Sequence, residues 1–162
     1  MKMMTLGKTD LVVSEVGFGA IPIIRLERQE AVRILRYAFD QGINYFDTAN
    51  AYRDSEEKIG CAFAGMRDRV VLATKTLRRD GDGVREHLER SLKMLQTDYL
   101  DLYQLHQIAQ EPDWEAVMAP GGAFDEAVRA RDAGKIRYLG VTSHSLAMAL
   151  KLVRTGLFDT IQ

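Results

Sequence analysis

Short apolar runs alternate along this chain with longer stretches of helical spacing, and this alternation is the strongest constraint on its fold. The run Val-Val-Leu-Ala-Thr at 70–74 is a strand signal, whereas Val84, Leu88, Leu92 and Leu95 form one stripe of a helix. Strands that alternate with helices indicate parallel strands joined by helical crossovers. Near-continuous apolar strands are typical of a sheet covered on both faces. We therefore expect an α/β protein.

The same pattern predicts a small hairpin followed by a series of strands and helices. Two short apolar pieces around a turn-rich stretch, residues 4–13, form the hairpin, which we expect to cap one end of the fold. No second domain or linker interrupts the alternation, so we expect one domain over residues 1–162. The predicted strands span residues 15–19, 43–47, 70–74, 99–105, 136–142 and 158–161.

Local signals add detail to the predicted helices. Asp54 and Asp82 each precede an apolar stripe and are predicted N-caps. The segment 107–122 is predicted to be a loop, and because it exceeds the usual two to six residues of such a connection, it is a candidate lid. The apolar residues that mark the last helix are Leu146, Leu150 and Val153.

Two architectures fit this alternation. A doubly wound open sheet suits 162 residues, whereas a (β/α)8 barrel seldom has fewer than about 200. The segment Gly17–Pro22 argues against the open sheet, because proline stands where the G-x-G-x-x-G phosphate turn has its third glycine. The residues alone leave both architectures open.

Composition excludes several classes of protein. A formal net charge of -1 without a basic stripe argues against a nucleic-acid partner. The single cysteine, Cys61, forbids an intrachain disulfide and fits a reducing compartment. The start at residues 1–7 lacks a secretory signal, and no apolar run approaches the roughly 20 residues of a membrane span. We expect a soluble cytoplasmic protein with no membrane partner and no metal site.

Four chemically active side chains stand just past successive predicted strands. Asp47 and Tyr52 follow the second strand, Lys75 the third and His106 the fourth. Catalytic groups gather at the carboxyl ends of parallel strands, so these four should meet although far apart in sequence. An acid, a phenol, an amine and an imidazole are together the parts for acid catalysis by a tyrosine.

The expected chemistry is proton donation to a carbonyl oxygen that gains negative charge. Tyr52 would donate the proton, and the ammonium of Lys75 would lower the pKa of that phenol. Asp47 would hold the ammonium, and His106 would orient the carbonyl. Each residue alone has a simpler explanation: a packing tyrosine, a surface lysine, a turn aspartate and a core histidine.

The motifs as a set resemble the aldo-keto reductases. They are Phe-Asp-Thr-Ala-Asn-Ala-Tyr at 46–52, Ala-Thr-Lys at 73–75, Leu-His-Gln at 105–107, Gly-Val-Thr-Ser at 140–143 and Asp-Thr-Ile-Gln at 159–162. The resemblance implies a (β/α)8 TIM-barrel fold, of which this chain covers the first six strands. It also implies reduction of aldehydes or ketones with NADPH, a small carbonyl substrate, and catalytic roles for the positions Asp47, Tyr52, Lys75 and His106.

The resemblance also identifies candidate cofactor-binding residues. Ser143 and Gln162 match positions that hold the nicotinamide carboxamide, with Asp47 close to them. His144 stands where the family often has asparagine, and Arg53 replaces a glycine common after the tyrosine. Both Ser143 and His144 have an alternative role as a cap of the following helix.

A barrel truncated after strand six leads to two further expectations. The chain alone should have little or no reductase activity, because the loops after strands seven and eight are not encoded. Its open sheet edges should favour self-association. Two alternative functions remain from the sequence: a non-catalytic, cofactor-binding regulatory protein of the same fold, and an independent open-sheet domain that resembles the family only locally.

Overall fold

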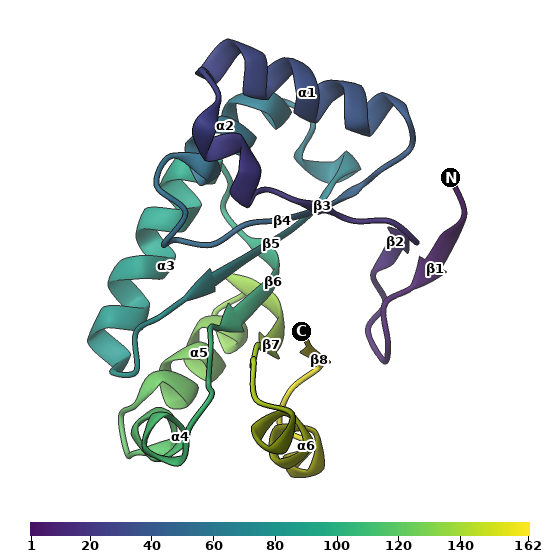
Figure 1. Cartoon of the computed structure of the whole chain (residues 1–162). Helices are drawn as coiled ribbons and strands as arrows, with labels where there is room; N and C mark the ends of the chain where they lie inside the picture. Colours follow the sequence, from purple (N-terminus) through teal and green to yellow (C-terminus); the bar gives the residue numbers. More distant parts are fainter.

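The computed structural model describes residues 1–162 and contains one sheet of six parallel strands with helices around it (Figure 1). The strands pair in the order in which they occur along the chain, and every neighbouring pair is parallel. Their bounds are β3 (Phe18–Gly19), β4 (Tyr45–Asp47), β5 (Val71–Thr76), β6 (Leu100–Leu105), β7 (Ile136–Val141) and β8 (Thr160–Ile161).

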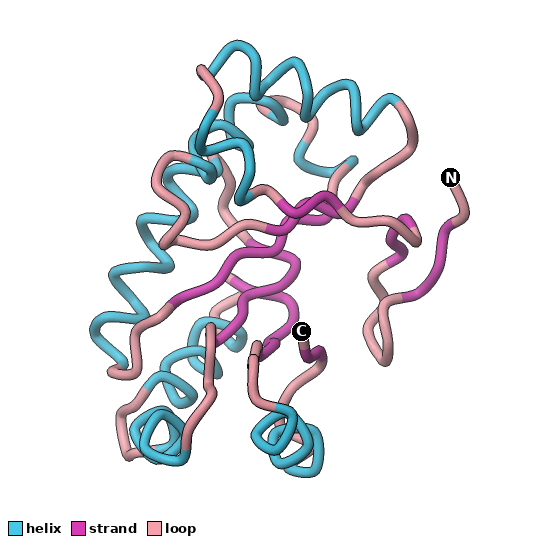
Figure 2. Tube along the Cα trace, in the orientation of Figure 1, coloured by secondary structure: helices cyan, strands magenta, loops and turns pink.

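This strand order selects the barrel type over the open sheet. A doubly wound sheet reverses its strand order at a switch point and carries helices on both faces. Here the order does not reverse, and the helices surround only the outer side of a curled sheet (Figure 2). The expectation of a six-stranded portion of a (β/α)8 barrel is therefore confirmed.

The helices are α1 (Arg28–Asp40), α2 (Ser55–Phe63), α3 (Gly81–Leu95), α4 (Glu111–Met118), α5 (Ala123–Asp132) and α6 (Leu146–Thr155), with short 3-10 turns η1 (Ile21–Arg25) and η2 (Arg67–Arg69).

Alternation along each strand separates an apolar outer face from a more polar inner face. Phe46, Leu72 and Tyr103 face the helices in a core of 28 buried residues. One inner row is Lys75, Gln104, Gly140 and Thr160, which are paired in register across neighbouring strands. Gly140 has no room for a side chain, because a Cβ there would lie 2.4 Å from Thr160 Oγ1. The inner face is thus filled closely at this level.

A hairpin closes the amino-terminal end of the sheet, as predicted. It consists of β1 (Met3–Thr5) and β2 (Val12–Ser14). Ser14 N donates to Asn44 Oδ1 at 2.7 Å just before β4, and Asp10 N donates to the Tyr138 hydroxyl at 3.0 Å early in β7. The hairpin therefore lies opposite the carboxyl ends of the strands.

Two of the local predictions are corrected by the structure. The segment 107–122 is not a plain loop, because it contains α4. The N-cap of α3 is Asp80 rather than Asp82, and its carboxylate accepts a hydrogen bond from Gly83 N at 2.7 Å. Gly81, the first residue of the helix, packs against the Gly121 carbonyl, where a Cβ would lie only 2.5 Å away, so this position has no room for a side chain. Asp54 is an N-cap by position, but no cap bond forms with its carboxylate.

The helix marked by Leu146, Leu150 and Val153 is present as α6, but it packs through other residues. Met148 and Leu152 are the residues of α6 that are buried. Leu146 is 90% exposed, and Leu150 and Val153 are also exposed, so they form an apolar stripe on the side turned away from the sheet. Periodicity located the helix but not the side that packs. No helix of the chain, α6 included, combines the length and the apolarity needed to cross a bilayer.

The corrected cap of α3 can be tested by two matched substitutions. Asp80→Ala should lower the urea midpoint of unfolding, because it removes the acceptor of the Gly83 amide at the helix start. Asp82→Ala should change the midpoint far less, since Asp82 lies in the exposed first turn and caps no amide. Equal losses for the two variants would contradict the assignment.

Candidate active site

All seven residues predicted from the sequence line one cavity of about 360 Å³ at the carboxyl ends of the strands. Three further residues line it that the sequence analysis did not select: Ile21, Gln107 and Thr142. Gln107 is the second residue after β6 and Thr142 the first after β7, so the rule that selected His106 also applied to them. The predicted residues in this cavity are Asp47, Tyr52, Lys75, His106, Ser143, His144 and Gln162.

A buried ion pair forms the floor of the site. Lys75 Nζ lies 2.5 Å from Asp47 Oδ2, and it also donates to the Thr48 carbonyl at 2.7 Å. The other carboxylate oxygen of Asp47 accepts a hydrogen bond from Gln104 Nε2 at 3.1 Å. Gln104 was missed by sequence analysis, although it lies two residues before His106 on the inner face of β6. Both charges are therefore held in place by neighbouring strands.

Burial changes the electrostatics of Lys75. Desolvation lowers the pKa of its ammonium below the usual value, and the Asp47 carboxylate opposes that change. The side chain of Lys75 is only 2% exposed. An ammonium carries three N–H donors, and the structure provides acceptors for two of them from Asp47 and Thr48. The third N–H donor remains free for a hydrogen bond to a group in the cavity.

Tyr52 lies in the turn between β4 and α2, beside the ion pair. Its ring centroid is 5.4 Å from Lys75 Nζ and 6.0 Å from the His106 ring. Burial raises the pKa of Tyr52 above its usual value, and the Asp47 carboxylate raises it further. The net shift of the Tyr52 pKa is therefore opposite to the lowering expected from Lys75. The charge of the ammonium is compensated by Asp47 at 2.5 Å, so burial and the carboxylate prevail.

The residue after Tyr52 adopts a backbone conformation that favours glycine. Arg53 has φ +46°, in the left-handed region where a Cβ is strained. The turn continues with a hydrogen bond from Ser55 N to the Tyr52 carbonyl at 2.9 Å, which leads into α2. The local geometry therefore gives a physical reason for a glycine at this position in similar proteins.

His106 directly follows β6 and is almost completely buried. Its backbone N–H donates to the Thr76 carbonyl at 2.9 Å, which fixes it beside the end of β5. Burial lowers the pKa of its imidazole to about 4, with smaller contributions from Lys75, His144 and Arg79. The ring is thus neutral near pH 7. Its Nδ1 is buried and has no hydrogen-bond partner in the chain.

The candidate cofactor residues meet at the ends of β7 and β8. Ser143 N donates to the Gln162 carbonyl at 3.0 Å, so these two residues are neighbours across the strand ends. Neither Ser143 nor His144 caps α6, because Ser145 accepts the hydrogen bond from Met148 N instead. His144 and the Gln162 side chain form no hydrogen bond within the chain, whereas Ser143 Oγ accepts one from Ser145 N.

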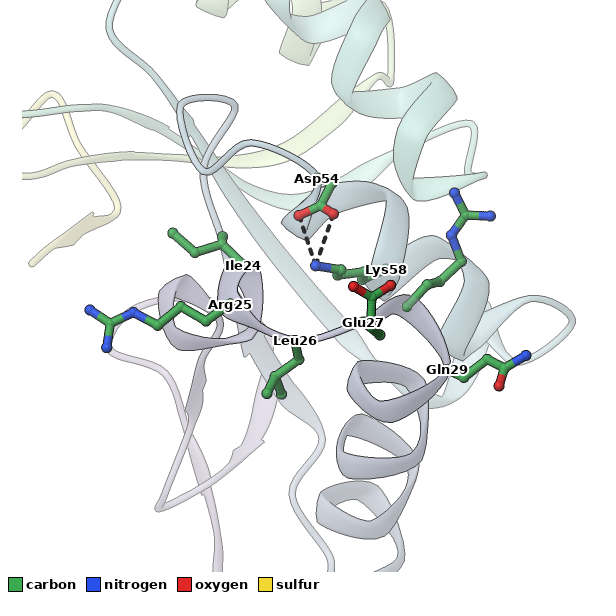
Figure 3. A pocket seen from close by; sticks show the side chains of 8 residues that line it. Ile24, Arg25, Leu26, Glu27, Gln29, Asp54 and Lys58 are labelled. Atoms are coloured by element: carbon green, nitrogen blue, oxygen red, sulfur yellow. Dashed lines mark hydrogen bonds and ion pairs between the residues drawn. The ribbon is translucent and has the colours of Figure 1, made fainter.

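A larger cavity of about 690 Å³ lies beside η1 and the start of α1, and none of the seven predicted residues line it. Figure 3 shows the Asp54 and Lys58 side chains meeting there. Lys58 Nζ lies 2.8 Å from Asp54 Oδ2 and donates to the Ile23 carbonyl at 3.0 Å. Within this cavity Asp54 and Lys58 compensate each other's charge, and Arg28 pairs with Glu57 outside it.

The Asp47 and Lys75 pair should be strongly coupled in stability. Lys75→Met should lower the free energy of unfolding by roughly 3–5 kcal/mol, because a buried carboxylate loses its cation. The double variant Asp47→Asn/Lys75→Met should recover much of that loss, since no buried charge remains. Urea unfolding of the wild type, both single variants and the double variant measures the coupling. Additive losses would contradict it.

Comparison with known proteins agrees with this geometry. A model of the Aldo/keto reductase family matches residues 15–160. Aldo-keto reductase YhdN of Bacillus subtilis is 37% identical over 166 residues, which covers 90% of this chain and 48% of that protein.

Two solved structures extend the agreement to three dimensions. A holo-form aldo-keto reductase of Bacillus halodurans is 32% identical with a TM-score of 0.83, covering 95% of this chain and 54% of that one. An aldo-keto reductase of Klebsiella pneumoniae in complex with NADPH is also 32% identical, with a TM-score of 0.78 and the same coverage. The chain spans about half the length of the curated relatives it matches. A matching family model, related sequences and a shared sheet together establish that the chain belongs to the aldo/keto reductase family.

Proposed function

We propose that this protein reduces small aldehydes or ketones by hydride transfer from NADPH, with Tyr52 as the proton donor. The observation that carries the proposal is that a phenol, a buried ammonium–carboxylate pair and a neutral imidazole line one cavity. They come from the ends of three successive strands. That combination matches the requirements of carbonyl reduction, in which charge develops on one oxygen.

The far side of the cavity suits a nicotinamide cofactor. His144 and Gln162 offer an imidazole and an amide without partners in the chain, next to the hydroxyl of Ser143. These groups can hydrogen-bond a carboxamide, with Asp47 nearby in the same cavity. The Klebsiella pneumoniae relative was solved with NADPH, which supports the same cofactor here. When bound, this cofactor supplies the hydride.

Tyr52, Lys75 and Asp47 would act as one proton-donating unit. The hydroxyl of Tyr52 is protonated near neutral pH, because the usual pKa of a phenol, about 10, lies well above 7 and burial raises it further. A proton is thus available for the substrate oxygen. When the phenol gives up that proton, the nearby ammonium of Lys75 stabilises the phenolate. Asp47 and the Thr48 carbonyl hold that ammonium in position. Lys75 therefore acts on the product of proton transfer.

His106 would orient the carbonyl as a neutral hydrogen-bond donor. A buried N–H without an acceptor is less favourable than a buried lone pair without a donor, so the unpartnered Nδ1 favours the tautomer with its proton on Nε2. The pKa near 4 keeps the second proton off the ring at neutral pH. The imidazole can then donate one hydrogen bond to the substrate oxygen.

Replacement of the phenol tests the proposal. In the protein expressed from its complete reading frame, Tyr52→Phe should lower kcat for aldehyde reduction by roughly 10²–10⁴-fold, because the proton donor is lost. NADPH affinity, measured by fluorescence titration, should stay close to the wild-type value. Tyr37→Phe is the control, since Tyr37 is exposed on α1 away from the cavity. Full activity of Tyr52→Phe would refute the proton-donor role.

A non-catalytic, cofactor-binding regulatory protein is the second candidate. The raised pKa of Tyr52 favours it, because a weaker acid transfers a proton less readily. The same titration separates the two functions. NADPH binding with no turnover of any aldehyde or ketone in a test panel would favour the regulator, and turnover abolished by Tyr52→Phe would favour the reductase.

We further propose that the 162-residue polypeptide on its own self-associates and turns over little NADPH. Each of β3 and β8 pairs with a single neighbour, and the α6 stripe adds exposed apolar surface. Light scattering after size exclusion should show dimers or larger species, and Leu146→Glu/Leu150→Glu should shift them toward monomers. Tyr37→Glu on exposed α1 is the control. A monomeric wild-type polypeptide with brisk turnover would contradict both statements.

A further inference from the structure

Arg79 lies between β5 and α3, outside the set of residues assigned above. Its Nη2 donates to the carbonyl oxygens of His106 at 2.9 Å and Gln107 at 3.1 Å. Its Nη1 donates to the Leu77 carbonyl at 3.2 Å, and its Nε lies 3.4 Å from Asp113 Oδ1 in α4. One guanidinium thus contacts the ends of two strands and a helix. Such use of several donors in a fixed geometry is a property of arginine that lysine lacks.

The main chain of the same segment is also tied to the region after β6. The Arg79 carbonyl accepts a hydrogen bond from Ala123 N at 2.9 Å, at the start of α5. Gln107 has φ +57°, a left-handed conformation that is unfavourable for a residue with a side chain. The bond from Arg79 to the Gln107 carbonyl opposes relaxation of that turn. The turn is the one that directs the His106 ring.

We infer that Arg79 is a positioning residue for His106. Its guanidinium fixes the turn that ends β6, and through Asp113 it connects that turn to α4. The direction of the His106 imidazole therefore depends on a side chain that does not line the cavity. The effect on catalysis rests on the proposed reductase function, whereas the effect on the imidazole itself does not.

The charge of Arg79 also acts on the imidazole. The groups that face His106 are Lys75 from β5, His144 after β7, Arg79 after β5 and the phenol of Tyr52 after β4. Burial is the main cause of the low His106 pKa, and the electrostatic effects of Lys75, His144 and Arg79 lower it further. Removal of the Arg79 charge should therefore raise the pKa of His106. A lysine at 79 should keep most of that electrostatic effect.

Two variants, tested in the protein expressed from its complete reading frame, separate the effect of the Arg79 hydrogen bonds from the effect of its positive charge. Arg79→Gln should raise the His106 pKa in an NMR titration and lower kcat roughly 10–100-fold, the scale expected for a displaced catalytic group. Arg79→Lys should leave the His106 pKa near the wild-type value and still lower kcat, because a single ammonium cannot form all the hydrogen bonds that the guanidinium forms. KM should change less than kcat in both variants. Arg33→Gln on the exposed face of α1 is the control. The His106 signal is assigned by its loss in His106→Asn.

The outcomes distinguish this inference from the proposed function. If Arg79→Gln leaves both the His106 pKa and kcat unchanged, the inference is overturned. If the wild type shows no reductase activity but the pKa responds, the effect on His106 stands and the proposed function fails. If Arg79→Gln does not fold, Arg79→Lys decides: reduced kcat with an unchanged pKa supports positioning, and unchanged kcat overturns it.

Discussion

Parallel pairing of the strands in chain order is the constraint on which the rest of this structure depends. Because each strand is added to the same edge of the sheet, every crossover places its helix on the outer side. The carboxyl ends of all six strands then lie along one curved rim. Residues as distant as Asp47 and Gln162 line one cavity for this reason alone. No local sequence signal brings them together.

The inner face of the sheet contains the charges, and its organisation explains how they are tolerated. A buried ion pair is favourable only when its remaining hydrogen-bonding groups are satisfied. Gln104 and the Thr48 carbonyl supply those bonds to Asp47 and Lys75. Tyr52 lies close enough to experience the carboxylate, so its acidity depends on how completely that carboxylate is engaged. Stability and chemistry are coupled through one carboxyl group.

Much of this architecture could be predicted from the sequence, because periodicity and strand-end residues are local signals. The hairpin and the four catalytic candidates were found in this way, whereas Ser143, His144 and Gln162 were identified through the resemblance to the family. Predictions failed where a distant contact decides. Asp80, not Asp82, caps α3, next to the close approach of Gly81 to Gly121, and α4 forms within the segment that was predicted to be a loop. The direction of the Tyr52 pKa, the role of Gln104 and the contacts of Arg79 likewise depend on three-dimensional neighbours.

The hairpin and the cavity lie at opposite ends of the same strands. Asn44 and Tyr138 hold the hairpin against the amino-terminal end through bonds that no cavity-lining residue shares. Substitutions in the loops at the carboxyl-terminal end of the strands can therefore leave the contacts of the hairpin intact. Because the hairpin contacts are separate from the residues that line the cavity, the cavity of such a scaffold can change while these contacts are kept.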